Sequence, residues 1–209
     1  MQLTTIVGPQ ASAGAGSTVQ NARSGAAGEL VVQELHGRYY ETAVRRSLFS
    51  GANLAAVTTS AGFATTATGF CLTNPIGSTV NLVLNKVSYG TIVAQTTALI
   101  LGIMTGYNTA TAVTQSTPLV PLSNFVGSPA GAGLIASSYV MPTAPTRLFL
   151  LDTLTTGALT VSPQGGKIVD LEGGIVIPPG GYAAFYTSAA SVATSLVFGM
   201  QWEEISIVV

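Results

Sequence analysis

Residues 80–87 read Val-Asn-Leu-Val-Leu-Asn-Lys-Val, and this stretch decides the fold class. Its residues form two alternating sets: Val80, Leu82, Leu84 and Lys86 in one, and Asn81, Val83, Asn85 and Val87 in the other. Successive side chains of a β-strand point to opposite faces, so a period of two is typical of a strand. No stretch of the chain has a sustained 3.6-residue apolar stripe with caps and charged flanks. The pattern therefore favours β structure.

Strong turn signals accompany the apolar runs. Asn74-Pro75-Ile76-Gly77 precedes the 80–87 stretch, and Pro178-Pro179-Gly180-Gly181 precedes a later run. Proline presets φ and glycine accepts a positive φ, so both segments predict tight turns. The strand candidates lie at short spacing along the chain: 30–35, 38–45, 52–58, 63–66, 69–73, 80–89, 91–104, 146–151, 158–161, 174–177, 181–187 and 194–207. With 24 Gly and 10 Pro, the chain is expected to be all-β, a jelly-roll-like antiparallel β-sandwich.

Charge is scarce along the whole chain. Seven basic and eight acidic residues make up 7 % of the 209 residues, against about 25 % in an average soluble domain. A compact fold of 21.2 kDa exposes about 9,000 Å², or roughly one charge per 600 Å², the size of the largest apolar patch on a typical monomer. Ser and Thr, 45 residues together, supply neutral polarity. We therefore expect other subunits to cover much of the surface.

The composition divides the chain into an arm and a body. Residues 1–28, with Gly-Pro-Gln-Ala-Ser-Ala-Gly-Ala-Gly-Ser at 8–17, offer little apolar area to offset ordering entropy and predict a flexible, extended N-terminal arm. The sandwich domain is expected over 29–209. Residues 107–145 are rich in Thr, Pro, Ser, Ala and Gly, and we expect them to be a long excursion without strong elements of its own.

Neither a nucleic acid nor a membrane is an expected partner. The formal net charge is −1 and no polybasic segment exists to neutralise phosphates. Arg45 and Arg46 are adjacent, but on a predicted strand they point to opposite faces. The longest apolar run, 91–106, is interrupted by polar residues and is shorter than the roughly 20 residues of a membrane-spanning helix.

The residues that usually carry catalysis are isolated. His36, the single histidine, has no metal-ligand partner two to four residues away, and no Gly-x-Ser-x-Gly motif is present. Cys71, the single cysteine, lies in the apolar run Gly-Phe-Cys-Leu-Thr, which predicts a buried, inert thiol. A single cysteine excludes a disulfide within the chain and a cysteine-based zinc site.

Two acidic pairs remain as candidates. Asp170 and Glu172 alternate, so they could bind a cation or act as an acid/base pair; a solvated loop before a strand is the interpretation we favour. Glu203 and Glu204 follow Trp202, and we expect one to face solvent and the other to pair with an arginine, Arg38 or Arg45. The glycine-rich run at 131–133 lacks the lysine of a phosphate loop. No catalytic, cofactor-binding or metal-binding residue is therefore predicted, and the chain is not expected to be an enzyme.

The seven tyrosines and the single tryptophan are dispersed along the chain. We expect most of them to pack in the core or at a contact between subunits. A row of exposed aromatic rings would bind sugars, so a carbohydrate-binding module with a glycan ligand stays an alternative.

Several segments resemble virion structural proteins of tailed bacteriophages. They are Leu35-His36-Gly37-Arg38-Tyr39-Tyr40-Glu41, Gly69 to Ser78 with its Leu-x-Asn-Pro-x-Gly-Ser turn, Asn81 to Ser88, Ile177-Pro178-Pro179-Gly180-Gly181, and Trp202-Glu203-Glu204. The similarity extends over roughly residues 30–205. It consists of turn and strand patterns and carries no catalytic residues.

The resemblance implies a jelly-roll protein that assembles as a homotrimer on a phage particle. The leading expectation is a capsid decoration or cement protein, made in the host cytoplasm, which binds the major capsid protein at the virion surface and stabilises the shell. One alternative is a head or tail fibre, or a baseplate component, with a receptor-binding role.

Overall fold

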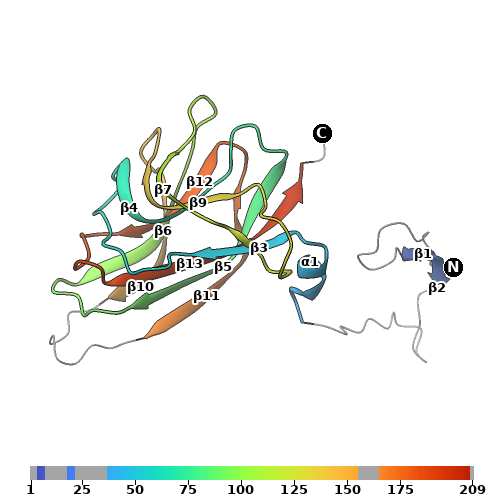
Figure 1. Ribbon diagram of the computed structural model, residues 1–209, viewed down its shortest axis with the longest axis horizontal. Coiled ribbons are helices and arrows are strands. Elements are labelled where there is room, and N and C mark those ends of the chain that lie inside the picture. Colours follow the sequence, from blue (N-terminus) through green and yellow to red (C-terminus); the bar gives the residue numbers. More distant parts are fainter. Residues whose placement is uncertain (1–3, 8–17, 22–36, 155–164, 208–209) are drawn as a thin grey trace.

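The computed structural model describes residues 4–7, 18–21, 37–154 and 165–207, most of which lie in two antiparallel sheets packed as a sandwich (Figure 1). The six-stranded sheet has the order β10 (Arg147–Leu154), β6 (Leu99–Tyr107), β12 (Gly181–Thr187), β4 (Thr66–Thr73), β9 (Leu134–Val140), β7 (Thr114–Leu119). The five-stranded sheet has the order β11 (Gly166–Ile177), β5 (Val80–Thr91), β13 (Leu196–Ser206), β3 (Leu48–Ala52), β8 (Leu122–Ser123). The predicted all-β antiparallel sandwich is confirmed.

The strand pairs are nested around residues 107–145. β6 pairs with β10, β5 with β11, β4 with β12 and β3 with β13. Each of the four strands from β3 to β6 therefore pairs with its counterpart among the four strands from β10 to β13. The eight strands form one long hairpin that is folded over, so that each sheet receives four of them.

Apolar side chains from both sheets meet in the main core. Phe185 of β12 stacks on Phe198 of β13, with 4.2 Å between the ring centroids. Phe49 of β3 stacks on Trp202 of β13 at 6.2 Å, and the Trp202 side chain is fully buried. Burial of apolar side chains such as these is the dominant favourable contribution to folding.

The alternation of the 80–87 stretch is confirmed as far as Leu84 and then changes phase. Leu82 and Leu84 are fully buried, but Val87, and not Lys86, is the next core residue. The partner strand β13 places Trp202 opposite Leu84 and Gln201 opposite Lys86, so Asn85 is an extra residue at a β-bulge. A bulge shifts all later side chains to the other face. It thus turns Lys86 away from the core.

The prediction for residues 107–145 is wrong, because this segment contains three strands. β9 joins the edge of β4, β7 joins β9, and β8 joins the edge of β3. The segment thus extends both sheets. The small Ala, Ser and Thr residues give no strong strand pattern, and pairing with the free edge of β4 decides the structure.

The predicted strand at 38–45 is also wrong. Residues Tyr40–Val44 form the short helix α1, with Arg45 donating its backbone N–H to the carbonyl of Glu41. Glu41 and Arg45 also form an i,i+4 ion pair at 3.9 Å, a spacing that supports a helix. Arg46 follows with φ of 60°, and its guanidinium lies over the Phe125 ring. Arg45 and Arg46 therefore have different partners because they follow the end of a helix, and not because they point to opposite faces of a strand.

Other predicted strands match in part. Residues 181–187 coincide with β12, and the 69–73 candidate lies within β4. The 63–66 candidate is wrong apart from its last residue, because β4 begins at Thr66. The 52–58 candidate is wrong beyond its first residue, because β3 ends at Ala52, and β6 starts later than predicted for 91–104. The 174–177 candidate is the end of the longer β11. The candidates at 30–35 and 158–161 lie outside the described residues.

A separate two-stranded sheet lies within the predicted arm. β1 (Thr4–Val7) and β2 (Thr18–Asn21) pair antiparallel and belong to neither large sheet, and Figure 1 shows them apart from the sandwich. The rest of the predicted arm lies outside the described residues. In the described part of the chain no helix has the length and hydropathy to cross a membrane.

Buried hydroxyl and amide side chains form hydrogen bonds inside the fold. Thr187 donates its hydroxyl to the Thr59 hydroxyl at 2.7 Å, and Thr59 accepts from the backbone N–H of Ser191 at 3.2 Å. All three residues are buried. Asn74, in the first predicted turn, donates its amide to the carbonyls of Val80 (2.7 Å) and Ile177 (3.0 Å). It thereby joins the two turn segments.

Candidate functional site

The acidic pair Asp170 and Glu172 lies at a wide bulge in β11, opposite Lys86 of β5. Glu172 accepts a hydrogen bond from Arg38 at 3.1 Å, and the Tyr39 hydroxyl donates to Asp170 at 3.2 Å. The backbone N–H of Glu172 lowers the pKa of the Asp170 carboxyl, with smaller contributions from Tyr39 and Arg38. The pair lies inside a strand, so the predicted solvated loop before a strand is wrong.

This acidic pair attaches the start of α1 to the sheet. The Lys86 ammonium lies 4.6 Å from the centroid of the Tyr39 ring, and the Arg38 guanidinium, which pairs directly with both carboxylates, lies 5.5 Å from it. Arg38 and Glu172 are largely exposed, and no group of three or more His, Cys, Asp or Glu gathers among the described residues. The contacts support a structural role for the pair.

Glu204 has a different partner from the one predicted. Its carboxylate accepts the backbone N–H groups of Ala132 and Gly133, both at 2.9 Å, and the Trp202 indole N–H at 3.2 Å. A Cβ at Gly131 would lie 2.3 Å from the carboxylate, so only glycine permits this approach. The glycine-rich run therefore binds an anion, and that anion is the protein's own carboxylate.

Glu203 lies close to Arg45 without forming a salt bridge within the described residues. Burial raises the pKa of the Glu203 carboxyl, and the charge of Arg45 opposes this shift. The predicted arginine partner therefore acts on Glu203 only at a distance, and for Glu204 the prediction is wrong. The sequence could not distinguish the two, because the loop that binds Glu204 is 71 residues away.

Cys71 is fully buried, as predicted. Burial raises the pKa of its thiol far above the ordinary value, so it remains protonated and unreactive at neutral pH. His36 lies outside the described residues.

One polar cluster was not predicted from the sequence. Asp152 of β10 accepts from Lys167 of β11 at 2.7 Å and from the hydroxyl of Tyr89 of β5. Lys167 and then Tyr89 lower the pKa of Asp152, while burial raises the pKa of Tyr89. The cluster joins the edge strands of the two sheets. The signal in the sequence that could have indicated this cluster is the acidic residue Asp152 within an otherwise apolar run.

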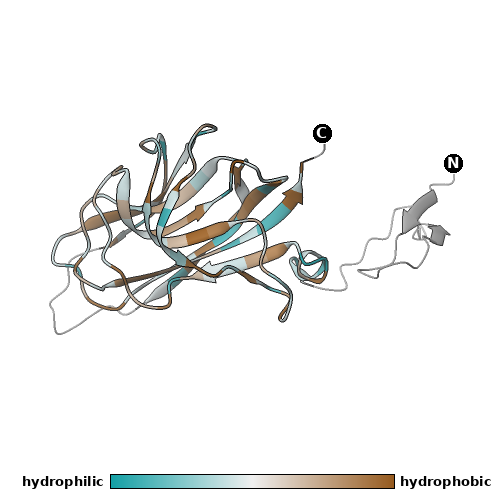
Figure 2. Ribbon diagram, turned by 45° about the horizontal axis from the view of Figure 1, so that its top comes forward, coloured by the Kyte–Doolittle hydropathy of each residue, from teal (hydrophilic) through white to brown (hydrophobic). Residues whose placement is uncertain are grey.

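A groove of about 430 Å³ crosses the outer face of the five-stranded sheet. Small or polar residues of β3, β5 and β13 form its floor: Ser50, Ala52, Ser88, Gly199 and Gln201. Lys86 is the single charged residue in its lining. The ribbon in Figure 2 has only short hydrophilic stretches, consistent with the scarcity of charge.

Large apolar side chains border this groove. Leu54, Val120, Leu122 and Ile168 lie around it and are 97 %, 73 %, 63 % and 74 % exposed. Only Val126 and Leu150 among the other described large apolar residues are more than 60 % exposed. Four of the six most exposed apolar side chains thus gather on one face. We call this surface the outer groove.

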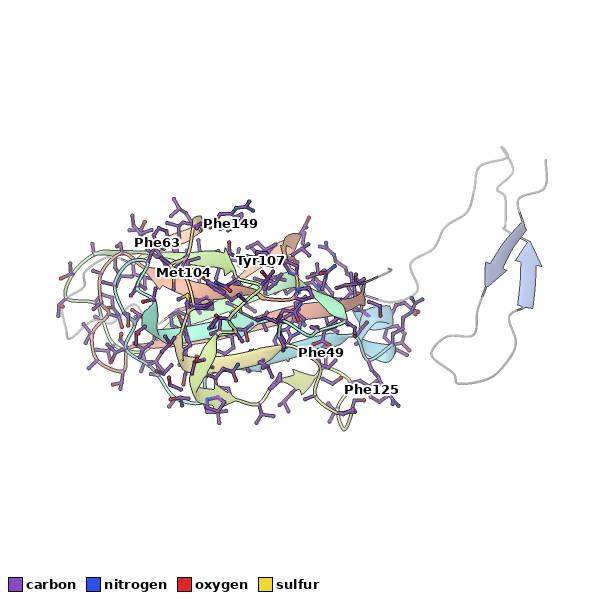
Figure 3. The ribbon with its side chains drawn as sticks, turned by 90° about the horizontal axis from the view of Figure 1, so that it is seen from above. Phe49, Phe63, Met104, Tyr107, Phe125 and Phe149 are labelled. Carbon is purple, nitrogen blue, oxygen red and sulfur yellow. The ribbon has the colours of Figure 1, made fainter. Side chains whose placement is uncertain are left out.

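A second hollow opens between the two sheets, where the edge strands β10 and β11 lie. It has a volume of about 420 Å³, and its lining includes Tyr107 of β6, Arg147 and Phe149 of β10, and Val176 of β11. Figure 3 shows Tyr107 and Phe149 on the same side of the sandwich, away from Phe125. We call this hollow the edge cleft. It shares no residue with the outer groove.

No protein-family model, no curated protein and no solved structure matches this chain. Any functional conclusion therefore rests on the residues and surfaces described above.

Proposed function

We propose that this protein is a non-enzymatic structural subunit that assembles as a homotrimer and decorates the capsid of a tailed bacteriophage. The single observation that carries the assembly role is the outer groove. Monomeric proteins rarely expose large contiguous apolar patches, and a patch of this kind marks a contact surface. The phage particle is inferred from the sequence resemblance in the turn and strand segments.

The occupant of the outer groove in this proposal is a second copy of the same chain. A partner with many charges would lose solvation against a lining that offers only Lys86. This chain is itself charge-poor, with 15 charges in 209 residues, so its own surface matches the groove. A groove that receives a different patch of the next copy makes a head-to-tail contact, and such contacts close into rings such as trimers.

The nested strand pairing supports a jelly roll, in which a long hairpin is rolled into two sheets. Jelly rolls occur in viral capsid proteins and also in lectins. The topology therefore agrees with a virion role but does not select it over sugar binding.

A cement role follows from mass action. A trimer that binds only the intact shell shifts the equilibrium away from disassembly, and the shift grows with the concentration of the free trimer. The major capsid protein is the partner in this proposal. A fibre or baseplate component would have the same fold but a low copy number.

The association is tested by light scattering on the purified chain. We expect three times the chain mass of 21.2 kDa, and we expect the double variant Leu54→Ser/Val120→Ser to be monomeric. Leu150→Ser is the matched control, because Leu150 is 68 % exposed but lies outside the groove. A wild-type monomer at micromolar concentration overturns the proposed trimer, and a trimeric double variant removes the outer groove as its interface.

The virion role needs a second measurement. We expect many copies of the chain per purified particle, located on the capsid, and particles without it should open at a lower temperature. A few copies at the tail would favour the receptor-binding alternative.

A further inference from the structure

The edge cleft combines one cation with exposed aromatic rings. Arg147 is opposite Thr105 in the pairing of β10 with β6, and Phe149 is two residues further along the same strand, on the same face. Tyr107 follows Thr105 at the same spacing on β6 and is 56 % exposed. These four side chains line a hollow that Val176 of β11 borders from the other sheet.

Arg147 forms no salt bridge with any described acidic residue. The cation at the other end of the β10/β11 side, by contrast, has an acidic partner. There Lys167 and Asp152 form an ion pair at 2.7 Å between β11 and β10. The carboxylates of Asp170 and Glu172 are paired with Arg38, and that of Glu204 binds backbone N–H groups. The edge cleft thus holds a guanidinium without a carboxylate partner inside the described fold.

We propose that the edge cleft binds an acidic sugar, a hexuronic acid unit of a glycan. The Arg147 guanidinium binds its carboxylate, because a planar fork of N–H donors matches two carboxylate oxygens. Tyr107 and Phe149 offer ring faces for the apolar side of the pyranose. The hydroxyls of Thr105 and Thr146, which also line the cleft, are donors and acceptors for sugar hydroxyls.

The volume suits such a ligand. Small-molecule sites usually measure about 300–1,000 Å³, and the cleft of about 420 Å³ admits one or two sugar units. The proposal goes beyond the assembly role and does not depend on it, because the outer groove lies on a different surface.

Arg147 also has a purely protective explanation. A charge directed inward on an edge strand prevents that strand from pairing with another sheet. The lysine variant separates the two roles, since it keeps the positive charge but loses the guanidinium fork.

The experiment measures binding of glucuronic acid to the full chain at pH 7 by ligand-observed NMR and calorimetry, with glucose and the methyl ester of glucuronic acid as uncharged probes. We expect a dissociation constant on the order of 1 mM for the acid, and affinity at least tenfold lower for both uncharged probes. Arg147→Ala should weaken acid binding about tenfold or more. Arg147→Lys should weaken it severalfold, and Tyr107→Ala about three- to tenfold.

Arg45→Ala is the control for the loss of one positive charge, because Arg45 is exposed and lies outside the cleft. It should bind the acid as the wild type does. The proposal is overturned if glucuronic acid does not bind, if glucose binds equally well, or if Arg147→Ala retains full affinity. Aggregation of Arg147→Ala with no acid binding by the wild type would assign Arg147 to edge protection alone.

Discussion

The two open sides of the sandwich are closed by different means. On one side, β7, β8 and β9 add strands to both sheets, and the Glu204 carboxylate fixes the loop before β9. On the other side the sheets end at β10 and β11, which are joined by the Asp152–Lys167 pair with Tyr89. Both sides have backbone pairing and buried apolar residues, Ile135 of β9 on the first and Ile175 and Ile177 of β11 on the second, but only the second adds a partly exposed ion pair between its two edge strands.

This difference matters because charge is scarce. An exposed ion pair contributes little, about 0–1 kcal/mol, whereas each buried apolar side chain contributes several times more. Burial of Ile135 on the β7–β9 side should therefore contribute more to stability than the ion pair on the β10/β11 side. The β10/β11 side is also the side with the edge cleft.

The largest effect is expected from Ile135→Ala in β9. Ile135 is fully buried in the main core, so the truncation should lower the free energy of unfolding by about 2–5 kcal/mol. Urea denaturation measures this change. The control is Leu134→Ala, because Leu134 is the preceding residue and is 42 % exposed. Equal losses in the two variants would mean that β9 is not fixed in the sheet.

A smaller loss is expected from Glu204→Gln. The amide keeps an acceptor oxygen but loses the charge and presents an N–H₂ group toward the N–H groups of Ala132 and Gly133. Loss of charge-assisted hydrogen bonds should reduce the free energy of unfolding by about 1–3 kcal/mol. Urea denaturation at pH 7 measures it.

Glu203→Gln is the matched control for that variant. Burial raises the pKa of the Glu203 carboxyl, so its ionised form is disfavoured in the folded protein. Removing this charge should leave stability unchanged or slightly higher. A loss in Glu203→Gln as large as that in Glu204→Gln would mean that the carboxylate charge itself, and not the loop contact, stabilises this side.

The side closed by β7, β8 and β9 is the one that the sequence predicted poorly. The strands β5 and β12 follow from alternation and from the two turns, because those signals are local. The strand β9 and the contact of Glu204 with Gly133 depend on residues far apart in the chain. Helix α1 was missed because residues 38–45 also alternate in polarity, and the Glu41–Arg45 spacing was the competing signal.

The surfaces were predicted only in outline. Low charge predicts that other subunits cover part of the surface, but it does not locate the outer groove. Leu54, Val120 and Ile168 come from three separate segments, and only the packing of β3, β8 and β11 brings them to one face. The edge cleft likewise requires the register that places Arg147 opposite Thr105.

The smallest effect is expected on the β10/β11 side, from Asp152→Asn. At pH 7 this variant should lose about 0.5–1 kcal/mol, because Lys167 is largely exposed and the pair is screened by solvent. The pKa of Asp152 is lowered in the folded state, chiefly by Lys167. The ion pair therefore makes its full contribution to stability at pH values above the pKa of Asp152 in the unfolded chain, about 4. This contribution is lost as the pH falls through the lower pKa that Asp152 has in the folded protein.

The difference between wild type and Asp152→Asn should accordingly shrink as the pH is lowered from about 6 to 2, as measured by urea denaturation at each pH. Glu203 and Asp170 titrate in the same range but are present in both proteins, so their contributions cancel in the difference. Lys167→Met completes a double-mutant cycle, which isolates the coupling of the pair. A coupling energy above about 2 kcal/mol would contradict the comparison, because the β10/β11 side would then be closed by a strong pair. A coupling near zero would sharpen it: the pairing of β10 with β6 and of β11 with β5, and not the ion pair, would then hold the two edge strands in place.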